Sequence, residues 1–304
     1  MKGFFGYYIK NQAKDGTTVS IIFGKTHETS FIQIITADNS HYIDLAGTPC
    51  HVIKRKFGIS IGNNTVDSGG IFLDITHDGI GVSADIKFGD LSPLRGERRR
   101  WKRHAGSSIM GPFRYLPFME CKHMIVSNHH TLSGHMTIRD SSGDKTYDFT
   151  NGIGYIEGDH GKSFPTKYFW TQAHYIEEHA PSRDIHISAS VARIPYLGAR
   201  FTGTICNILY NGKQHRLATY RGARVKRFDQ DGIAIKQRGY VLYIEVLGHN
   251  NSLPLLAPTR GKMSRTIHES VQTTIRYKLT HKNQTLFDFT TNHATHEFSD
   301  IKQA

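Results

Sequence analysis

Short stretches of alternating apolar and polar residues recur along the whole 304-residue chain, and turn-forming pairs separate them. In the run IFLDI, this alternation places Ile71, Leu73 and Ile75 on one face of a strand. Asn211-Gly212 lies between two such runs and supplies the positive φ angles that a tight hairpin requires. Because no segment of comparable length keeps a 3.6-residue apolar period, the pattern predicts an all-β protein.

Many short strands must close into barrels or pair their faces to hide their edges. The length suits two domains, and a polar, glycine-rich stretch at 148–154 (DFTNGIG) marks the expected boundary. We therefore predict two antiparallel β-barrels or sandwiches in tandem, an N-terminal one over 1–150 and a C-terminal one over 151–304. A short echo between 30–33 (SFIQ) and 169–172 (FWTQ) suggests that the two halves are similar.

Neither a spanning helix nor a secretory leader is visible, since no run of 18 apolar residues occurs and the first residues turn polar at once. The cytoplasm is therefore the expected location. Cys50, Cys121 and Cys206 are odd in number and widely separated. We expect three reduced, mostly buried thiols rather than a disulfide framework or a zinc site.

The densest group of polar and aromatic side chains falls at 154–174 (GYIEGDHGKSFPTKYFWTQAH). Four titratable residues lie within six positions, and an aromatic run follows them. Such density is unusual for a plain turn. The glycines at 158 and 161 are expected to let the chain bend sharply between strands.

This segment resembles the signature of the tocopherol cyclase-like family, a Gly-Tyr-x-Glu-x-Asp-Trp-Gly-x-Ser-Phe-Pro stretch followed by Trp-x-Gln. Further blocks at 109–123, 255–269 and 31–33 agree with the family and occur in its order. One position departs from the pattern, because His160 stands where the family has Trp.

The resemblance implies two lipocalin-like β-barrels, akin to carotenoid hydratase-like folds, that enclose a lipophilic, prenylated or isoprenoid small molecule. It also implies acid-catalysed cyclisation, hydration or isomerisation of an alkene, with no cofactor. A non-catalytic lipocalin-like carrier of the same class of ligand is the alternative.

Protonation of an alkene needs a proton donor and a place for a tertiary cation. A carboxylic acid in an apolar pocket stays protonated near neutral pH, and aromatic faces stabilise the cation. We expect Glu157 and Asp159 to be the acids, with His160 as a third catalytic candidate. The binding candidates are Tyr155, Tyr168 and Trp170 as a cation wall, Gln172 to orient a phenol, quinol or water, and Phe164, Glu120, His123 and Gln33.

Structural roles for these residues stay open beside the catalytic ones. Glu157 or Asp159 would serve equally well to cap a turn or pair with Lys162, and Trp170 would fit a core. Glu120 and His123 would form a buried polar pair. No metal site is expected, because the 19 histidines include no HxH or HExxH pattern.

Much of the excess positive charge, which is +12 for the chain, lies at 95–104 (RGERRRWKRH). A solvated loop is the simplest interpretation. Nucleic acid is not expected as a partner, because no helix-turn-helix, zinc-finger or RNP-type motif accompanies the cluster. Peripheral contact of Arg95–Arg103 with an anionic membrane is the better functional hypothesis, because a lipophilic substrate would arrive from a membrane.

Overall fold

The computed structural model describes residues 3–53, 56–94, 108–176, 184–248 and 252–301. It divides into two compact units. The first comprises Met1–Ser107, His123–His160 and Arg260–Lys262; the second comprises Ser108–Lys122, Gly161–Thr259 and Met263–Ala304.

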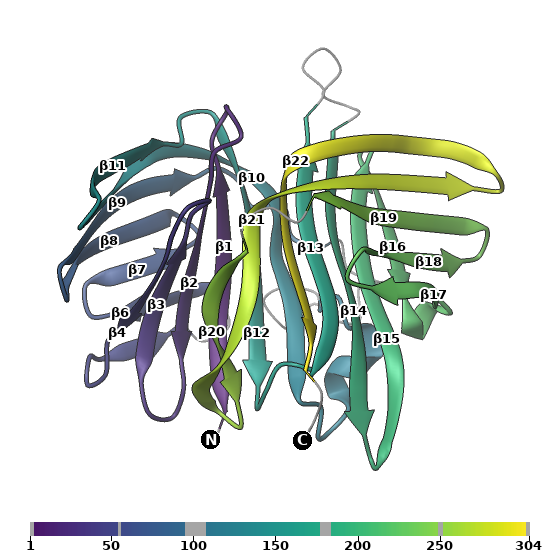
Figure 1. The fold of residues 1–304 in the computed structure, drawn as a ribbon, viewed down its shortest axis with the longest axis horizontal. Coiled ribbons are helices and arrows are strands. Elements are labelled where there is room, and N and C mark those ends of the chain that lie inside the picture. The colour runs from purple at the N-terminus through teal and green to yellow at the C-terminus, as the bar shows by residue number, and fades with distance from the viewer. Residues whose placement is uncertain (1–2, 54–55, 95–107, 177–183, 249–251, 302–304) are drawn as a thin grey trace. The chain divides into compact units, whose positions relative to one another are not determined.

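The first sheet has twelve strands among the described residues, hydrogen-bonded in the order β4-β3-β2-β1-β12-β10-β9-β8-β7-β6-β5, with β11 paired to β10 (Figure 1). The strands are β1 (Phe4–Gln12), β2 (Thr18–Lys25), β3 (Ser30–Ile35), β4 (Ser40–Asp44), β5 (Cys50–Val52), β6 (Gly58–Ile61), β7 (Asn64–Asp67), β8 (Gly70–His77), β9 (Ile80–Phe88), β10 (Cys121–Asp140), β11 (Gly143–Asp148) and β12 (Gly152–Gly161).

The second sheet has ten strands within the described ranges, in the order β16-β15-β14-β13-β22-β21-β19-β18-β17, with β20 paired to β21 (Figure 1). The strands are β13 (Lys167–Tyr175), β14 (Ile185–Tyr196), β15 (Ala199–Tyr210), β16 (Lys213–Ala218), β17 (Arg224–Asp229), β18 (Gly232–Gln237), β19 (Tyr240–Gly248), β20 (Leu253–Thr259), β21 (Lys262–His281) and β22 (Gln284–Asp300). Two short 3-10 helices, η2 (Gly111–Tyr115) and η4 (Thr219–Arg221), accompany it.

Both sheets follow one plan, so the predicted all-β fold with two large antiparallel sheets is confirmed. Each begins with four consecutive strands and ends with a strand inserted beside the first, β12 next to β1 and β22 next to β13. The echo proposed from the sequence does not follow this plan. Gln33 lies on β3, the third strand of its sheet, whereas Gln172 lies on β13, the first strand of its own.

The boundary between the units differs from the predicted one at 150/151. β12 pairs with β1 and β10 in the first sheet, so residues 152–160 belong to the first unit. The polar stretch at 148–151 is only the turn between β11 and β12. The densest sequence segment is therefore divided, its acidic half in the first unit and its aromatic half in the second.

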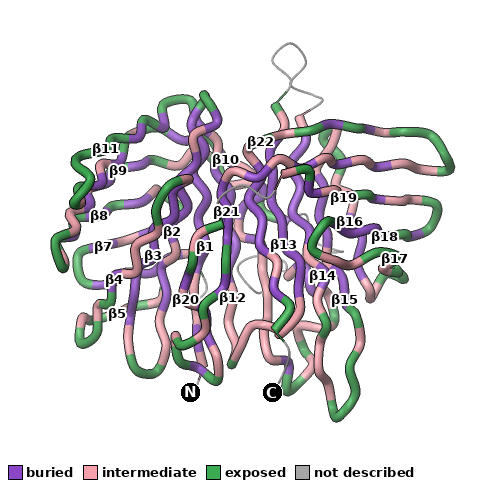
Figure 2. Tube along the Cα trace, in the orientation of Figure 1, coloured by how far each residue is buried: buried purple, intermediate pink, exposed green. Residues whose placement is uncertain are grey.

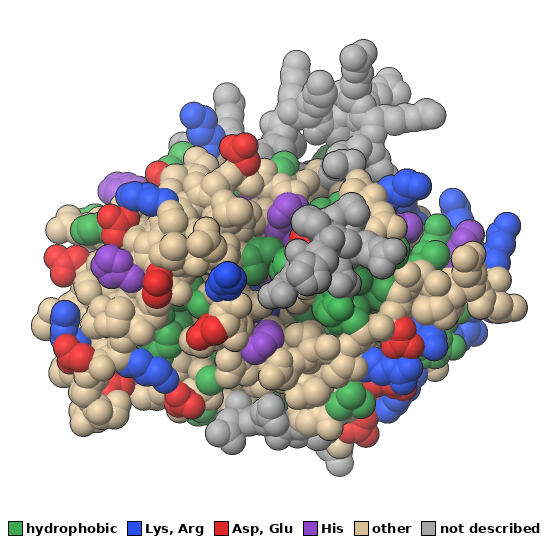
Figure 3. Space-filling model, turned by 90° about the horizontal axis from the view of Figure 1, so that it is seen from above, with side chains coloured by type: hydrophobic (Ala, Val, Ile, Leu, Met, Phe, Trp, Pro, Cys, Tyr) green, Lys and Arg blue, Asp and Glu red, His purple; other side chains and the backbone are tan. Residues whose placement is uncertain are grey.

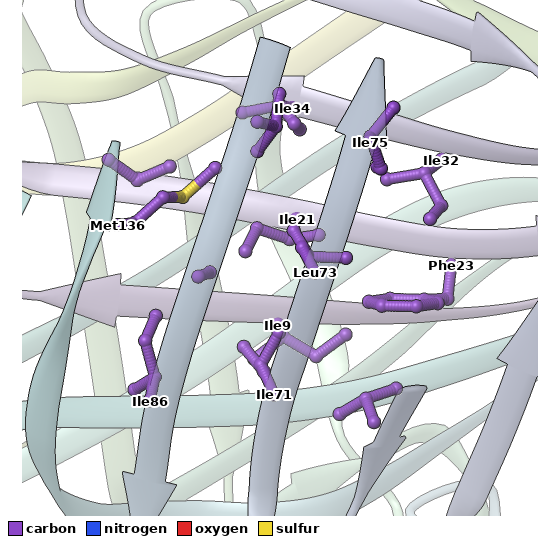
Figure 4. Packing of buried hydrophobic residues seen from close by; sticks show 14 of the residues in the cluster. Ile9, Ile21, Phe23, Ile32, Ile34, Ile71, Leu73, Ile75, Ile86 and Met136 are labelled. Carbon is purple, nitrogen blue, oxygen red and sulfur yellow. The ribbon is translucent and has the colours of Figure 1, made fainter. Parts of the chain in front are cut away.

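A cluster of buried isoleucines, leucines and aromatic residues forms the core of the first unit (Figure 4). On β8, Ile71, Leu73 and Ile75 are buried and the residues between them are exposed, as the alternation predicts. Burying each such side chain stabilises the fold by roughly 1.5–3 kcal/mol. Tyr7 and Ile9 on β1 pack into the same cluster.

The second unit has its own apolar cluster, built from alternate residues of its strands. On β13, Phe169 and Ala173 face this cluster. The Asn211-Gly212 hairpin joins β15 to β16 with φ angles of 49° and 64°, as predicted. In both units, the exposed segments gather at turns and outer strands (Figure 2).

The three cysteines are free thiols. Cys206 is buried, which raises the pKa of its thiol, whereas Cys50 and Cys121 are only half-buried. The basic cluster at 95–104 lies outside the described residues. On the face shown in Figure 3, the first unit's basic and acidic side chains are interspersed. Among the described residues, no helix has the length and apolar character that crossing a membrane requires.

Candidate active site

Strand β12 presents three functional side chains on one face. Ile156 packs into the apolar cluster of the first unit. Because side chains alternate along a strand, Tyr155, Glu157 and Asp159 point to the opposite face of the sheet. Tyr155 and Glu157 are nevertheless 1% and 5% exposed. A buried carboxylate on the face away from the apolar core needs polar partners to offset its desolvation.

These partners come from β12 itself and from its neighbour β10. The hydroxyl of Tyr155 donates a 2.6 Å hydrogen bond to Oε2 of Glu157. His123, on β10, places Nδ1 3.0 Å from Oδ1 of Asp159 and Nε2 3.4 Å from Oε2 of Glu157. We refer to Tyr155, Glu157, Asp159 and His123 as the His123 cluster.

The charges of the cluster act on its imidazole. Burial by itself lowers the pKa of His123, but the nearby carboxylates of Glu157 and Asp159, together with the hydrogen bond to Asp159, raise it to about 9. His123 is therefore an imidazolium at neutral pH, and both of its ring nitrogens donate. The single positive charge of His123 balances one of the two carboxylates. The other carboxylate can therefore take up a proton.

Potential metal-ligand atoms of His123, Glu157 and Asp159 lie within 4.8 Å of one another, and no other such group occurs in the described ranges. Each ring nitrogen of His123 faces a different carboxylate in this structure. The same three side chains are also of the types that bind metal ions.

Contrary to the prediction, Gly158 and Gly161 do not bend the chain between strands. Neither Gly158 nor Gly161 has a positive φ, and both lie within β12. A Cβ at Gly158 would lie 2.9 Å from the ring of Tyr7, and one at Gly161 would lie 2.0 Å from the carbonyl oxygen of Glu120. The two glycines allow close packing against a neighbour rather than a bend.

His160 is not brought to the cluster. It follows Asp159 on the strand, so its side chain points to the other face of the sheet. Asp159 forms an ion pair with His123, and its pairing with Lys162 stays a prediction. Gln33 is buried on β3, on the face opposite Ile32 and Ile34, with β2 and β1 between it and β12.

The described contacts of Glu120 and His123 are with other residues, so the pairing of these two stays a prediction. His123 contacts Glu157 and Asp159, whereas Glu120 interacts electrostatically with Arg200 and Arg265. Burial raises the pKa of Glu120, and these two arginines partly offset it.

Apart from Tyr155, the aromatic candidates lie in the second unit. Tyr168, Trp170 and Gln172 share the face of β13 that points away from the apolar cluster of this unit. Tyr168 donates a hydrogen bond to Glu297, and Phe164 packs edge-on against the Tyr168 ring at 6.2 Å. The Gln172 amide contacts His174, while its buried Oε1 has no hydrogen-bond partner.

Several buried polar residues that were not predicted as site residues lie on β1, β21 and β22. Glu269 and Glu297 are directly opposite on β21 and β22 and are 3% and 7% exposed. Lys10 is fully buried on β1, between the core residue Ile9 and the buried Asn11. The signal was present in the sequence, because the alternation in YYIKNQ places Lys10 opposite the apolar side of its strand.

Comparison with known proteins agrees with this fold. The family model described as tocopherol cyclase-like matches residues 82–299. The chain belongs to the tocopherol cyclase-like family. No curated protein sequence matches it.

Two solved structures share the fold at low sequence identity. Kievitone hydratase from Nectria haematococca aligns with a TM-score of 0.54 and 13% identity, over 98% of this chain and 89% of that chain. CghA with Sch210972 aligns with a TM-score of 0.62 and 9% identity, over 99% of this chain and 90% of that chain.

Proposed function

We propose that this member of the tocopherol cyclase-like family is an enzyme that protonates an alkene of a lipophilic, prenylated substrate. The observation that carries the proposal is the His123 cluster, in which a nearly inaccessible Glu157 lies beside a second carboxylate and an imidazolium. Family membership and a fold shared with a protein named as a hydratase support chemistry of the hydratase or cyclase type.

Within the cluster, Asp159 and Glu157 have different roles. Asp159 is the more exposed carboxylate and lies closer to His123, so the two form the charge pair. We assign the transferable proton to Glu157, because it is the more buried of the two carboxyl groups and Asp159 is the nearer counter-ion of His123. The hydroxyl of Tyr155 donates to Oε2 of Glu157 and so orients the carboxyl group.

The reaction follows from this assignment. The O–H bond of Glu157 breaks as the alkene π pair forms a C–H bond, and a cation is left on the more substituted carbon. A hydroxyl of the substrate closes a ring, water adds, or a neighbouring carbon loses a proton. In each case, the proton that is released restores the carboxyl group of Glu157.

The test separates an enzyme from a carrier. The protein is incubated with a prenylated hydroquinone, and both the bound and the released material are analysed by mass spectrometry. An isomeric product or one heavier by a water is expected from the wild type, while Glu157→Gln binds the substrate unchanged. If the wild type and Glu157→Gln both return only unaltered ligand, the protein is a lipocalin-like carrier and the catalytic proposal is wrong.

A further inference from the structure

The two most exposed large apolar side chains of the described residues are Phe118 and Leu197, at 78% and 75%. Both belong to the second unit. Both also have left-handed backbone conformations, with φ angles of 62° and 48°. Bulky residues rarely adopt this conformation, which costs on the order of 1–3 kcal/mol.

A comparison of the turns at the two ends of β15 shows that Leu197 is an unusual residue for its position. The β15–β16 turn uses Asn211-Gly212, the pair that folding favours at two consecutive left-handed positions. The β14–β15 turn has the same geometry but uses Leu197-Gly198. Stability alone would favour asparagine in place of Leu197, so an exposed leucine here indicates a role outside the fold.

Two contacts bring the segments that carry these side chains together. Phe113 of η2 packs edge-on against Phe201 of β15, with ring centroids 6.2 Å apart. Glu120 interacts electrostatically with Arg200. Tyr115, which is 53% exposed, lies between Phe113 and Phe118 in the same segment. In Figure 1, the β14–β15 turn extends beyond the neighbouring strands of its sheet.

The charge around these side chains is mainly basic, and the acidic residue next to them, Glu120, interacts with Arg200. Neither 111–119 nor 193–202 contains an acidic residue. Arg193 and Arg200 are exposed, and Arg114 lies over the ring of Tyr115 at 5.3 Å. Exposed apolar side chains flanked by arginines are complementary to a membrane surface, where apolar groups enter the acyl region and cations meet anionic headgroups.

We propose that Phe118 and Leu197, flanked by Arg114, Arg193 and Arg200, dock this protein on anionic lipid bilayers. We call these five residues the docking tips. Exposed apolar side chains mark contact sites for proteins or membranes, and the flanking arginines favour an anionic lipid surface. The proposal concerns how the protein meets a lipid surface and is independent of the chemistry of the His123 cluster.

The test is co-sedimentation of the full chain with phosphatidylcholine vesicles that contain phosphatidylglycerol. Phe118→Asn with Leu197→Asn should weaken binding by about tenfold or more. Asparagine suits both backbone conformations, so the variant should keep or gain thermal stability. The matched control is Phe72→Asn with Leu247→Asn, which removes two exposed apolar side chains elsewhere and should bind as the wild type does.

The contribution of the arginines to vesicle binding is tested separately. Arg193→Gln with Arg200→Gln should weaken binding by about fivefold per arginine, and the effect should disappear on vesicles of phosphatidylcholine alone. Three results would overturn the proposal. The wild type fails to bind the anionic vesicles, the two asparagine pairs weaken binding equally, or binding is lost only when the arginines of 95–103 are replaced by glutamine.

Discussion

The hydroxyl of Tyr155 donates a 2.6 Å hydrogen bond to Oε2 of Glu157, two positions further along β12. Residues two apart share a face of a strand, so this pair is set by the pleat of a single strand. The strand itself supplies the carboxyl group and the group that orients it, and β10 adds His123. The core of the candidate site is therefore local in sequence.

Tyr155→Phe tests the orienting role of the hydroxyl. The phenyl ring keeps the buried volume, but Oε2 of Glu157 loses a donor in a nearly inaccessible place. We expect a loss of about 1–3 kcal/mol in the free energy of unfolding, measured by urea denaturation. Turnover of a prenylated hydroquinone should fall but persist. Unchanged stability and turnover would show that the hydrogen bond is incidental.

The pH dependence of stability tests the charges on His123. Its pKa is raised from 6.5 to about 9, so the ion pairs stabilise the folded state fully below pH 6.5 and are lost as the pH rises through 9. The free energy of unfolding should fall by roughly 2–3 kcal/mol over this range. In His123→Gln this decline should be absent.

The raised pKa of His123 can be measured directly by NMR titration of its ring. The wild type should show a midpoint near 9, and Asp159→Asn should lower it, because one of the two carboxylates is removed. A midpoint near the ordinary histidine value in the wild type would contradict the proximity of His123 to both acids.

Gly161→Ala tests the close approach at the end of β12. Its Cβ would lie 2.0 Å from the carbonyl oxygen of Glu120, a backbone atom that cannot rotate away. Overpacking of this kind costs about 1–3 kcal/mol, which thermal denaturation would reveal. Gly143→Ala is an informative comparison, because nothing lies within 4 Å of the added Cβ but φ is 112°. A smaller loss at Gly161 than at Gly143 would contradict the steric argument.

Much of the fold could be predicted from the sequence, because strand alternation and turn chemistry are local. The buried set on β8 and the Asn211-Gly212 hairpin follow from pairs and periods a few residues long. The boundary between the units could not be predicted in this way. β12 joins the first sheet through its pairing with β1, a strand some 140 residues earlier in the chain, and local composition does not report such pairing.

In the candidate site, too, residues close in sequence could be predicted together, whereas partners distant in sequence could not. Tyr155, Glu157 and Asp159 were found together because one strand presents them. His123 was assigned to Glu120, its neighbour in sequence, although the sheet pairs it with Asp159. His160 was included for its charge, but the pleat points it away. Glu297 was missed because its partner Tyr168 lies 129 positions away.

Turnover in deuterium oxide tests the central claim most directly, because a proton delivered by Glu157 comes from solvent and ends on carbon. The product formed from a prenylated hydroquinone is re-equilibrated in ordinary water and its mass is measured. The account predicts a product that keeps one carbon-bound deuterium with the wild type and no product with Glu157→Gln. A product without deuterium, or an equal yield from Glu157→Gln, would contradict it.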